Sequence, residues 1–259
     1  MKLMINHQTH YQYTDWAKNS IQYIKMMPQS NQHQQVHTWE ISMPGNKQMK
    51  KDAFDNLWLT NTQTDPFQKM LIMAQGVVEI DFNHRYGIDH ALSPWLFLQS
   101  TTATWCNREM FAFAHHYVPQ LSLTYFHALA EALLSKMPYR CETTTVCHTA
   151  TASFIAGEGV CQDHSHVFIA MAKALGVPAR YVSGYLFANN QSHLASHAWA
   201  EIYLDGNWHV IDVSNQLFQP QAHVYVAIGR DYWDVAPVRG VRERGGIETM
   251  YSIVQVLAC

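Results

Sequence analysis

A turn signal at positions 205 and 206 is the feature that most restricts how this chain folds. Asp205 and Gly206 separate two runs, 197–204 and 207–213, whose residues suit β-strands. Asp-Gly is a strong signal for a hairpin with a two-residue loop. The residues that flank this pair then face each other, which fixes the partner of every residue further along both strands.

This register places a histidine beside a carboxylate. Counting outward from the turn, Trp199 faces Asp212 across the two strands. Direct partners point to the same side of a sheet, and so do residues two apart on one strand, so His197 shares that side. His197 and Asp212 are therefore diagonal neighbours, with Cβ atoms about 7–8 Å apart or somewhat less. A hydrogen bond between them is within reach, whereas a three-residue loop would separate them.

Cys161 stands at the start of a predicted helix, 161–175, that follows a glycine-rich loop at 157–159. The N-terminus of a helix carries partial positive charge and unpaired backbone N–H groups. Both favour a thiolate, and the same N–H groups can bind the oxyanion that forms when sulfur attacks a carbonyl. The helix carries few charges, which predicts that it is buried beneath a sheet.

Together, Cys161, His197 and Asp212 predict a catalytic triad. An imidazole generates the thiolate, and a carboxylate fixes the tautomer of the imidazole and stabilises its positive charge. Each residue also has a simpler interpretation: a packed cysteine, a half-buried strand histidine, and a strand-end aspartate. The order and context of all three favour an enzyme that carries out covalent chemistry at a carbonyl.

The composition excludes some other classes of protein. The chain has 259 residues, of which 48% are apolar and 14% charged, enough for two modest domains with a large core. A formal charge of −3 argues against nucleic acid as a partner. The first residues offer no apolar stretch for a signal peptide or a membrane helix, so we expect no membrane association and a cytoplasmic location.

The pattern along the chain predicts three parts. Residues 1–80 read as an N-terminal β domain, 81–103 as a connector, and 104–259 as the catalytic domain. Beyond the elements already named, the expected helices are 104–117 and 122–136, and the expected strands are 35–43, 57–59, 70–73, 77–80, 179–187, 223–228 and 249–257. This order predicts an α+β protein.

Cysteine and histidine positions raise the question of a metal site. Five cysteines do not form an even disulfide framework, so we expect free thiols. The residues that cluster in sequence are Cys141, Cys147, His148, His164 and His166. Five residues between two cysteines is not a usual zinc spacing, so we predict neither a metal nor another cofactor.

Several segments resemble the transglutaminase-like superfamily in its bacterial branch. The matching segments are 159–163, 170–184, 197–201, Asp212, 226–232 and 234–240, together with His7, Thr9, Tyr11, Tyr13 and 52–56 near the start. The resemblance implies a papain-like core, in which the cysteine helix packs on an antiparallel sheet, preceded by the bacterial transglutaminase-like N-terminal domain of antiparallel strands. It also implies that Cys161 is the nucleophile, His197 the general base and acid, and Asp212 the orienting carboxylate.

Departures from the family pattern bear on the substrate. His164 stands where the family usually has Phe, residues 213 and 214 are Val-Ser in place of Pro-Thr, and Asp55 stands where Gly is frequent. None of these changes removes a catalytic group. We take Trp199, Gln162 and His164 as the candidate residues of the substrate pocket.

The resemblance implies hydrolysis of an amide bond, by a peptidase, isopeptidase or amidase, through a thioester on the enzyme. Bacterial members are commonly described as cysteine proteases, so the expected partner is a peptide or protein with an amide or isopeptide bond. One alternative is acyl transfer to an amine, which uses the same catalytic groups. Another is a binding module without catalysis. The sequence does not indicate the oligomeric state.

Overall fold

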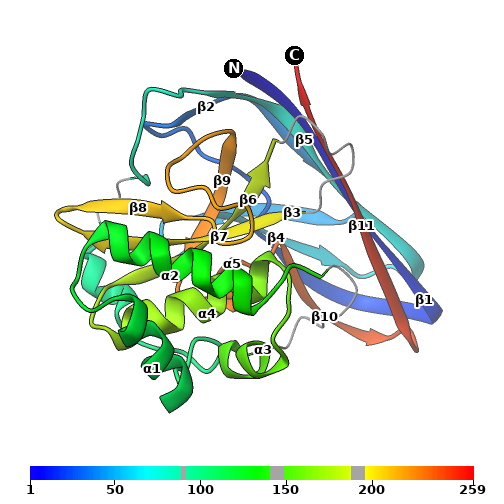
Figure 1. Cartoon of the computed structure of the whole chain (residues 1–259). Coiled ribbons are helices and arrows are strands. Elements are labelled where there is room, and N and C mark those ends of the chain that lie inside the picture. Colours follow the sequence, from blue (N-terminus) through cyan, green and yellow to red (C-terminus); the bar gives the residue numbers. More distant parts are fainter. Residues whose placement is uncertain (89–91, 141–148, 188–195) are drawn as a thin grey trace.

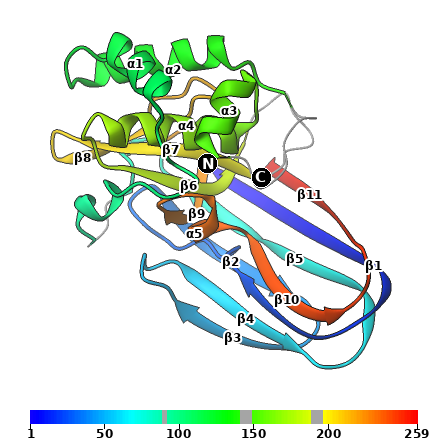
Figure 2. The same cartoon turned by 90° about the horizontal axis from the view of Figure 1, so that it is seen from below.

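The computed structural model describes residues 1–88, 92–140, 149–187 and 196–259. The described strands form two antiparallel sheets, one of seven strands and one of four. Figures 1 and 2 show the helices gathered against the smaller sheet, with the larger sheet on the other side of it. This is the expected α+β architecture.

The larger sheet is built around one long strand, β1 (Lys2–Ile24). Its first half pairs with β5 and β11, and its second half pairs with β4 and β10. The other strands of this sheet are β2 (Gln34–Ser42), β3 (Asn46–Lys51), β4 (Leu57–Gln63), β5 (Phe67–Ile80), β10 (Val238–Arg244) and β11 (Glu248–Ala258). The last two strands thus return to the N-terminal sheet, and both chain ends lie side by side (Figure 1).

The predicted domain limits, 1–80, 81–103 and 104–259, stay a proposal. Residues 238–258 fall within the third part by sequence and pair with β1 of the first part in space. Leu3 and Ile5 of β1 also belong to the same buried apolar cluster as the cysteine helix. The N-terminal sheet therefore shares a core with the segment that carries Cys161.

The smaller sheet has the strand order β8-β7-β6-β9. Its strands are β6 (Ala179–Leu186), β7 (His197–Leu204), β8 (Asn207–Ile211) and β9 (His223–Gly229). The helices are η1 (Pro94–Phe97), α1 (Arg108–Tyr117), α2 (Leu123–Lys136), α3 (Ala150–Ala156), α4 (Cys161–Ala174) and α5 (Tyr232–Val235). The helix predicted to begin at residue 104 begins at Arg108, because Asn107 caps it by accepting the Met110 backbone N–H at 2.8 Å.

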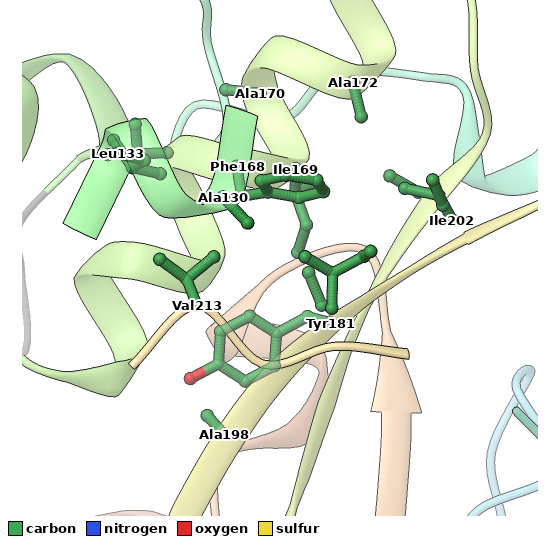
Figure 3. Packing of buried hydrophobic residues seen from close by; sticks show 14 of the residues in the cluster. Ala130, Leu133, Phe168, Ile169, Ala170, Ala172, Tyr181, Ala198, Ile202 and Val213 are labelled. Carbon is green, nitrogen blue, oxygen red and sulfur yellow. The ribbon is translucent and has the colours of Figure 1, made fainter. Parts of the chain in front are cut away.

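Helix α4 lies between helices α1, α2 and α3 and the smaller sheet, as its low charge predicts. Every residue from Asp163 to Lys173 is buried. Figure 3 shows Phe168 and Ile169 of α4 near Tyr181 of β6, with Leu133 of α2 on the far side of the helix. Packing on both sides fixes the direction of α4, and with it the position of Cys161.

The β7–β8 hairpin has the predicted register. Leu204 pairs with Asn207, and Ala200 pairs with Ile211. Asp205 and Gly206 have φ angles of 50° and 82°. A two-residue turn with both central residues in the left-handed region matches the twist of the flanking strands. The turn therefore sets which residues of the hairpin share a face.

The outer edge of β9 is covered by side chains of the N-terminal region. The Gln34 side chain donates to the Tyr225 carbonyl at 2.8 Å and accepts the Tyr225 N–H at 2.7 Å. Asn56 forms the same pair of bonds with Ile228, both at 2.8 Å. These amides take the place of a neighbouring strand, because they satisfy backbone groups that an edge strand leaves unpaired.

Candidate active site

Cys161 is the first residue of α4 and is partly exposed. The preceding turn is held by Asp163, which accepts the Val160 N–H at 2.9 Å and the Ser153 hydroxyl at 2.7 Å. Gly159 is required here because a Cβ atom at this position would lie 2.6 Å from the Cβ of Asp163. The turn presents the sulfur at the end of the helix where backbone N–H groups are free of helical partners.

His197 and Asp212 meet as the hairpin register predicts. His197 is the first residue of β7, and its Nε2 lies 2.8 Å from Oδ2 of Asp212, which directly follows β8. The His197 side chain is 12% exposed and that of Asp212 is 1% exposed. The ion pair is therefore almost entirely shielded from water.

The electrostatics of His197 favour its protonated form. Burial alone lowers the pKa of His197, but the charge and hydrogen bond of Asp212, with a hydrogen bond and charge from Cys161, raise it to about 10. Nε2 is engaged by Asp212, so Nδ1 is the ring atom left for the thiol proton. Asp212 and Cys161 thus both act on the His197 imidazole, which makes the three residues a candidate triad.

Asp212 is held by more than His197. Its Oδ2 accepts the Asn215 side-chain amide at 2.9 Å, and its Oδ1 accepts the Asn215 backbone N–H at 3.2 Å. His223 lies 3.3 Å from the same Oδ2. Burial raises the pKa of Asp212, but His197 and His223 outweigh it and hold the pKa far below its usual range. The carboxylate is therefore ionised at neutral pH.

Trp199 and His164 lie under the site. Both are 0% exposed, and the Trp199 ring stacks on His197 with centroids 5.9 Å apart. His164 Nε2 donates to the Met137 carbonyl at 2.7 Å, and Nδ1 accepts the Ser214 hydroxyl at 2.8 Å. Because both side chains are buried, Trp199 and His164 are placed to support the candidate triad rather than to contact a substrate. Substrate contact stays a prediction for Gln162, which is partly exposed.

The histidine in place of the family's Phe thus has a structural role. His164 links the end of α2 to the loop after β8, one residue before Asn215. Burial lowers the pKa of His164, so the ring is neutral and can donate at one nitrogen and accept at the other.

Sequence reasoning did not identify His223 and Asn215 as part of the site. A predicted strand over 223–228 was available for His223, but the register of β9 against β6 depends on residues far apart in sequence. Asn215 offered a local signal, since an aspartate three residues earlier can accept its backbone N–H in a turn.

Within the described residues, one set of side chains has the spacing of a metal site. Ligand atoms of His197, Asp212 and His223 all lie within 4.8 Å of one another. These atoms already satisfy each other, because both imidazole Nε2 atoms lie at hydrogen-bonding distance from one carboxylate oxygen. Three members of the cluster considered from sequence, Cys141, Cys147 and His148, lie outside the described residues.

None of the helices in the described parts of the chain has the length and apolar character needed to cross a bilayer.

Comparison with known families identifies the class of protein. Residues 118–213 match the model of the transglutaminase-like superfamily, and residues 3–79 match that of the bacterial transglutaminase-like N-terminal region. The chain therefore carries a transglutaminase-like core region and the bacterial transglutaminase-like N-terminal region, as the resemblance implied.

Several similar proteins match this chain over nearly its full length. An uncharacterised protein of Mycobacterium tuberculosis is 26% identical over 272 residues, covering 92% of this chain and 86% of its own. An uncharacterised protein of Mycobacterium leprae is 25% identical over 282 residues, covering 98% of each chain. The crystal structure of a presumed cysteine protease from Cytophaga hutchinsonii has a TM-score of 0.81 at 19% identity, covering 99% of this chain and 90% of that one. The last likeness shows a common fold.

Proposed function

We propose that this protein is a cysteine-dependent amide hydrolase that acts through a thioester. The observation that carries the proposal is the buried His197–Asp212 pair beside Cys161, in which the pKa of His197 is raised to about 10. An imidazolium at that position stabilises a thiolate at the start of α4. The substrate class is a peptide or protein with an amide or isopeptide bond.

In the proposed reaction the Cys161 thiolate attacks the carbonyl carbon, and the C=O π electrons move to oxygen. Backbone N–H groups at the start of α4 stabilise the oxyanion. His197 then gives its Nδ1 proton to the leaving nitrogen as the C–N bond breaks, which leaves a thioester and a free amine. Water next attacks the thioester while His197 takes its proton. The collapse of this second intermediate releases the acid and restores the thiolate–imidazolium pair.

The first test needs no known substrate. We expect iodoacetamide to alkylate Cys161 at neutral pH faster than Cys106 or Cys259, as read by peptide mass spectrometry. Cys259 is the exposed internal reference, and Cys106 is a slow reference because burial raises its pKa to about 11. A rate at Cys161 no higher than that at Cys259 would contradict the proposal.

The second test decides the reaction. Incubation of the protein with a peptide library and a primary amine, followed by mass spectrometry, separates the outcomes. A product with the mass of added water indicates hydrolysis, and a product with the joined amine indicates acyl transfer. Cys161→Ala should abolish either product. A product that persists in this variant at the wild-type rate would exclude Cys161 as the nucleophile.

A further inference from the structure

A second histidine lies against the carboxylate of the candidate triad. His223 is the first residue of β9 and is 0% exposed. Its Nε2 is 3.3 Å from Oδ2 of Asp212, the same oxygen that His197 contacts. The ring also packs edge-on against Trp199, with centroids 4.7 Å apart. The site therefore has two imidazoles on one carboxylate oxygen.

Hydrogen bonding assigns the tautomer of His223. The backbone N–H of Gln221 donates to Nδ1 at 3.1 Å, so Nδ1 presents a lone pair. The proton of the neutral ring is then on Nε2, where it is donated to Asp212. Burial lowers the pKa of His223, which keeps the ring neutral. A neutral donor orients the carboxylate without cancelling the charge that stabilises the His197 imidazolium.

His223 is itself held by the N-terminal region. Its backbone carbonyl accepts Nε2–H of His33 at 2.9 Å. Two residues further along β9, Gln34 forms its pair of hydrogen bonds with the Tyr225 backbone. The position of the ring is thus fixed at its backbone and at its Nδ1, with the remaining polar atom aimed at Asp212.

We propose that His223 is a positioning residue of the site, which holds the Asp212 carboxylate in the orientation that His197 requires. This inference rests on the proposed function. It assigns to β9 and to the N-terminal region a part in the chemistry, through the chain of contacts from His33 to His223 to Asp212. The other charged or titratable groups that act on His223 are His197 and Glu201.

Two variants of His223 distinguish the roles of its two ring nitrogens, Nδ1 and Nε2. His223→Gln places an amide N–H near the position of Nε2, so it retains the donor to Asp212. His223→Asn places an oxygen near the position of Nδ1, so it retains the acceptor for the Gln221 N–H and is too short to reach Asp212. Both variants replace the ring by a neutral amide, so each is a control for the other.

The readouts are the pH dependence of Cys161 alkylation by iodoacetamide and the titration of His197 by ¹⁵N NMR. In His223→Asn we expect the His197 titration to move down from about 10 by about one pH unit, the effect of one hydrogen bond to a charged group. Alkylation at neutral pH should change little, because His197 stays protonated there, and the alkylation profile should depart from wild type only at the pH where His197 titrates. In His223→Gln the His197 titration should lie within about 0.3 pH unit of wild type. Equal behaviour of the two variants, whether impaired or normal, would overturn the proposal.

A measurement on the wild-type protein keeps the proposal testable if a variant fails to fold. The ¹⁵N shifts of His223 should show a neutral ring protonated at Nε2 at pH 7. A ring protonated at Nδ1, or a charged ring, would overturn the assignment. Failure of the proposed function is distinguishable from failure of this inference. In that case Cys161 would react no faster than the exposed Cys259 in the wild-type protein, while the NMR shifts would still report the hydrogen bond from His223 to Asp212.

Discussion

Replacing the carboxylate of the buried pair is the most direct test of how the site works. Asp212→Asn keeps the shape of the side chain and removes its charge. In the wild-type protein the pKa of His197 is raised from 6.5 to about 10. This net difference corresponds to about 5 kcal/mol, which remains after the opposing effect of burial, and Asp212 and Cys161 share the favourable contribution. Burial of the ring remains in the variant and lowers its pKa, so His197 should be neutral at pH 7.

A neutral His197 no longer stabilises the Cys161 thiolate. We therefore expect alkylation of Cys161 at pH 7 to slow on the order of 100-fold in Asp212→Asn. Asp205→Asn is the matched control. It makes the same chemical change in the same hairpin, at an exposed turn residue with a φ of 50°, which Asn tolerates well.

Stability should show a related pH dependence. The raised pKa of His197 contributes stability that is complete below pH 6.5 and is lost as pH rises toward 10. The lowered pKa of Asp212 contributes stability that is present above 3.8 and is lost as pH falls below it. The free energy of unfolding of Asp212→Asn should therefore differ most from wild type between these limits, and the difference should narrow by pH 9. Urea unfolding at pH 5, 7 and 9 measures it.

Asp212 does not have the proposed role if Asp212→Asn gives the same alkylation profile as Asp205→Asn and the wild-type protein. The same conclusion follows if the difference in unfolding free energy between Asp212→Asn and wild type widens from pH 5 to pH 9.

Two further substitutions test the surroundings of the site. Gly159→Ala should lower the unfolding free energy by about 1–3 kcal/mol, because the new Cβ would lie 2.6 Å from Asp163 Cβ, and thermal unfolding measures the loss. Asn56→Ala leaves both backbone groups of Ile228 without their partner and should cost about 2–4 kcal/mol in urea unfolding. Asn46→Ala, on an exposed strand, is its control, and an equal effect of the two would contradict the assigned role of the amide.

Local sequence signals predicted the register of the β7–β8 hairpin and the start of helix α4. The Asp-Gly pair determined the register of β7 and β8, because a two-residue turn leaves a single way to pair the strands. The start of α4 at Cys161 followed from the loop before it, and its burial followed from its few charges. These two elements bring the candidate triad together, so most of that geometry was accessible from the sequence.

Long-range pairing was not accessible in the same way. No strand was predicted at β3 or β10, and residues 1–80 were expected to form a β domain without the prediction of one strand that continues from Lys2 to Ile24. The β10 sequence is rich in arginine and becomes a strand because β1 supplies its backbone partners. Such pairing depends on contacts between distant residues rather than on local preference. Helix α3 was also missed, although Thr149 caps it by accepting the Ala152 N–H at 3.3 Å.

The difference between local signals and long-range pairing also explains why His223 was not predicted as part of the site. The position of His223 depends on β9, and the outer edge of β9 is covered by side chains from residues more than 170 positions earlier in the chain. Without Gln34 and Asn56, backbone groups of Tyr225 and Ile228 would lack partners, and β9 would be an open sheet edge. The N-terminal sheet therefore does more than precede the core. It completes the sheet that carries His197, and it holds the strand whose first residue contacts the carboxylate of the pair.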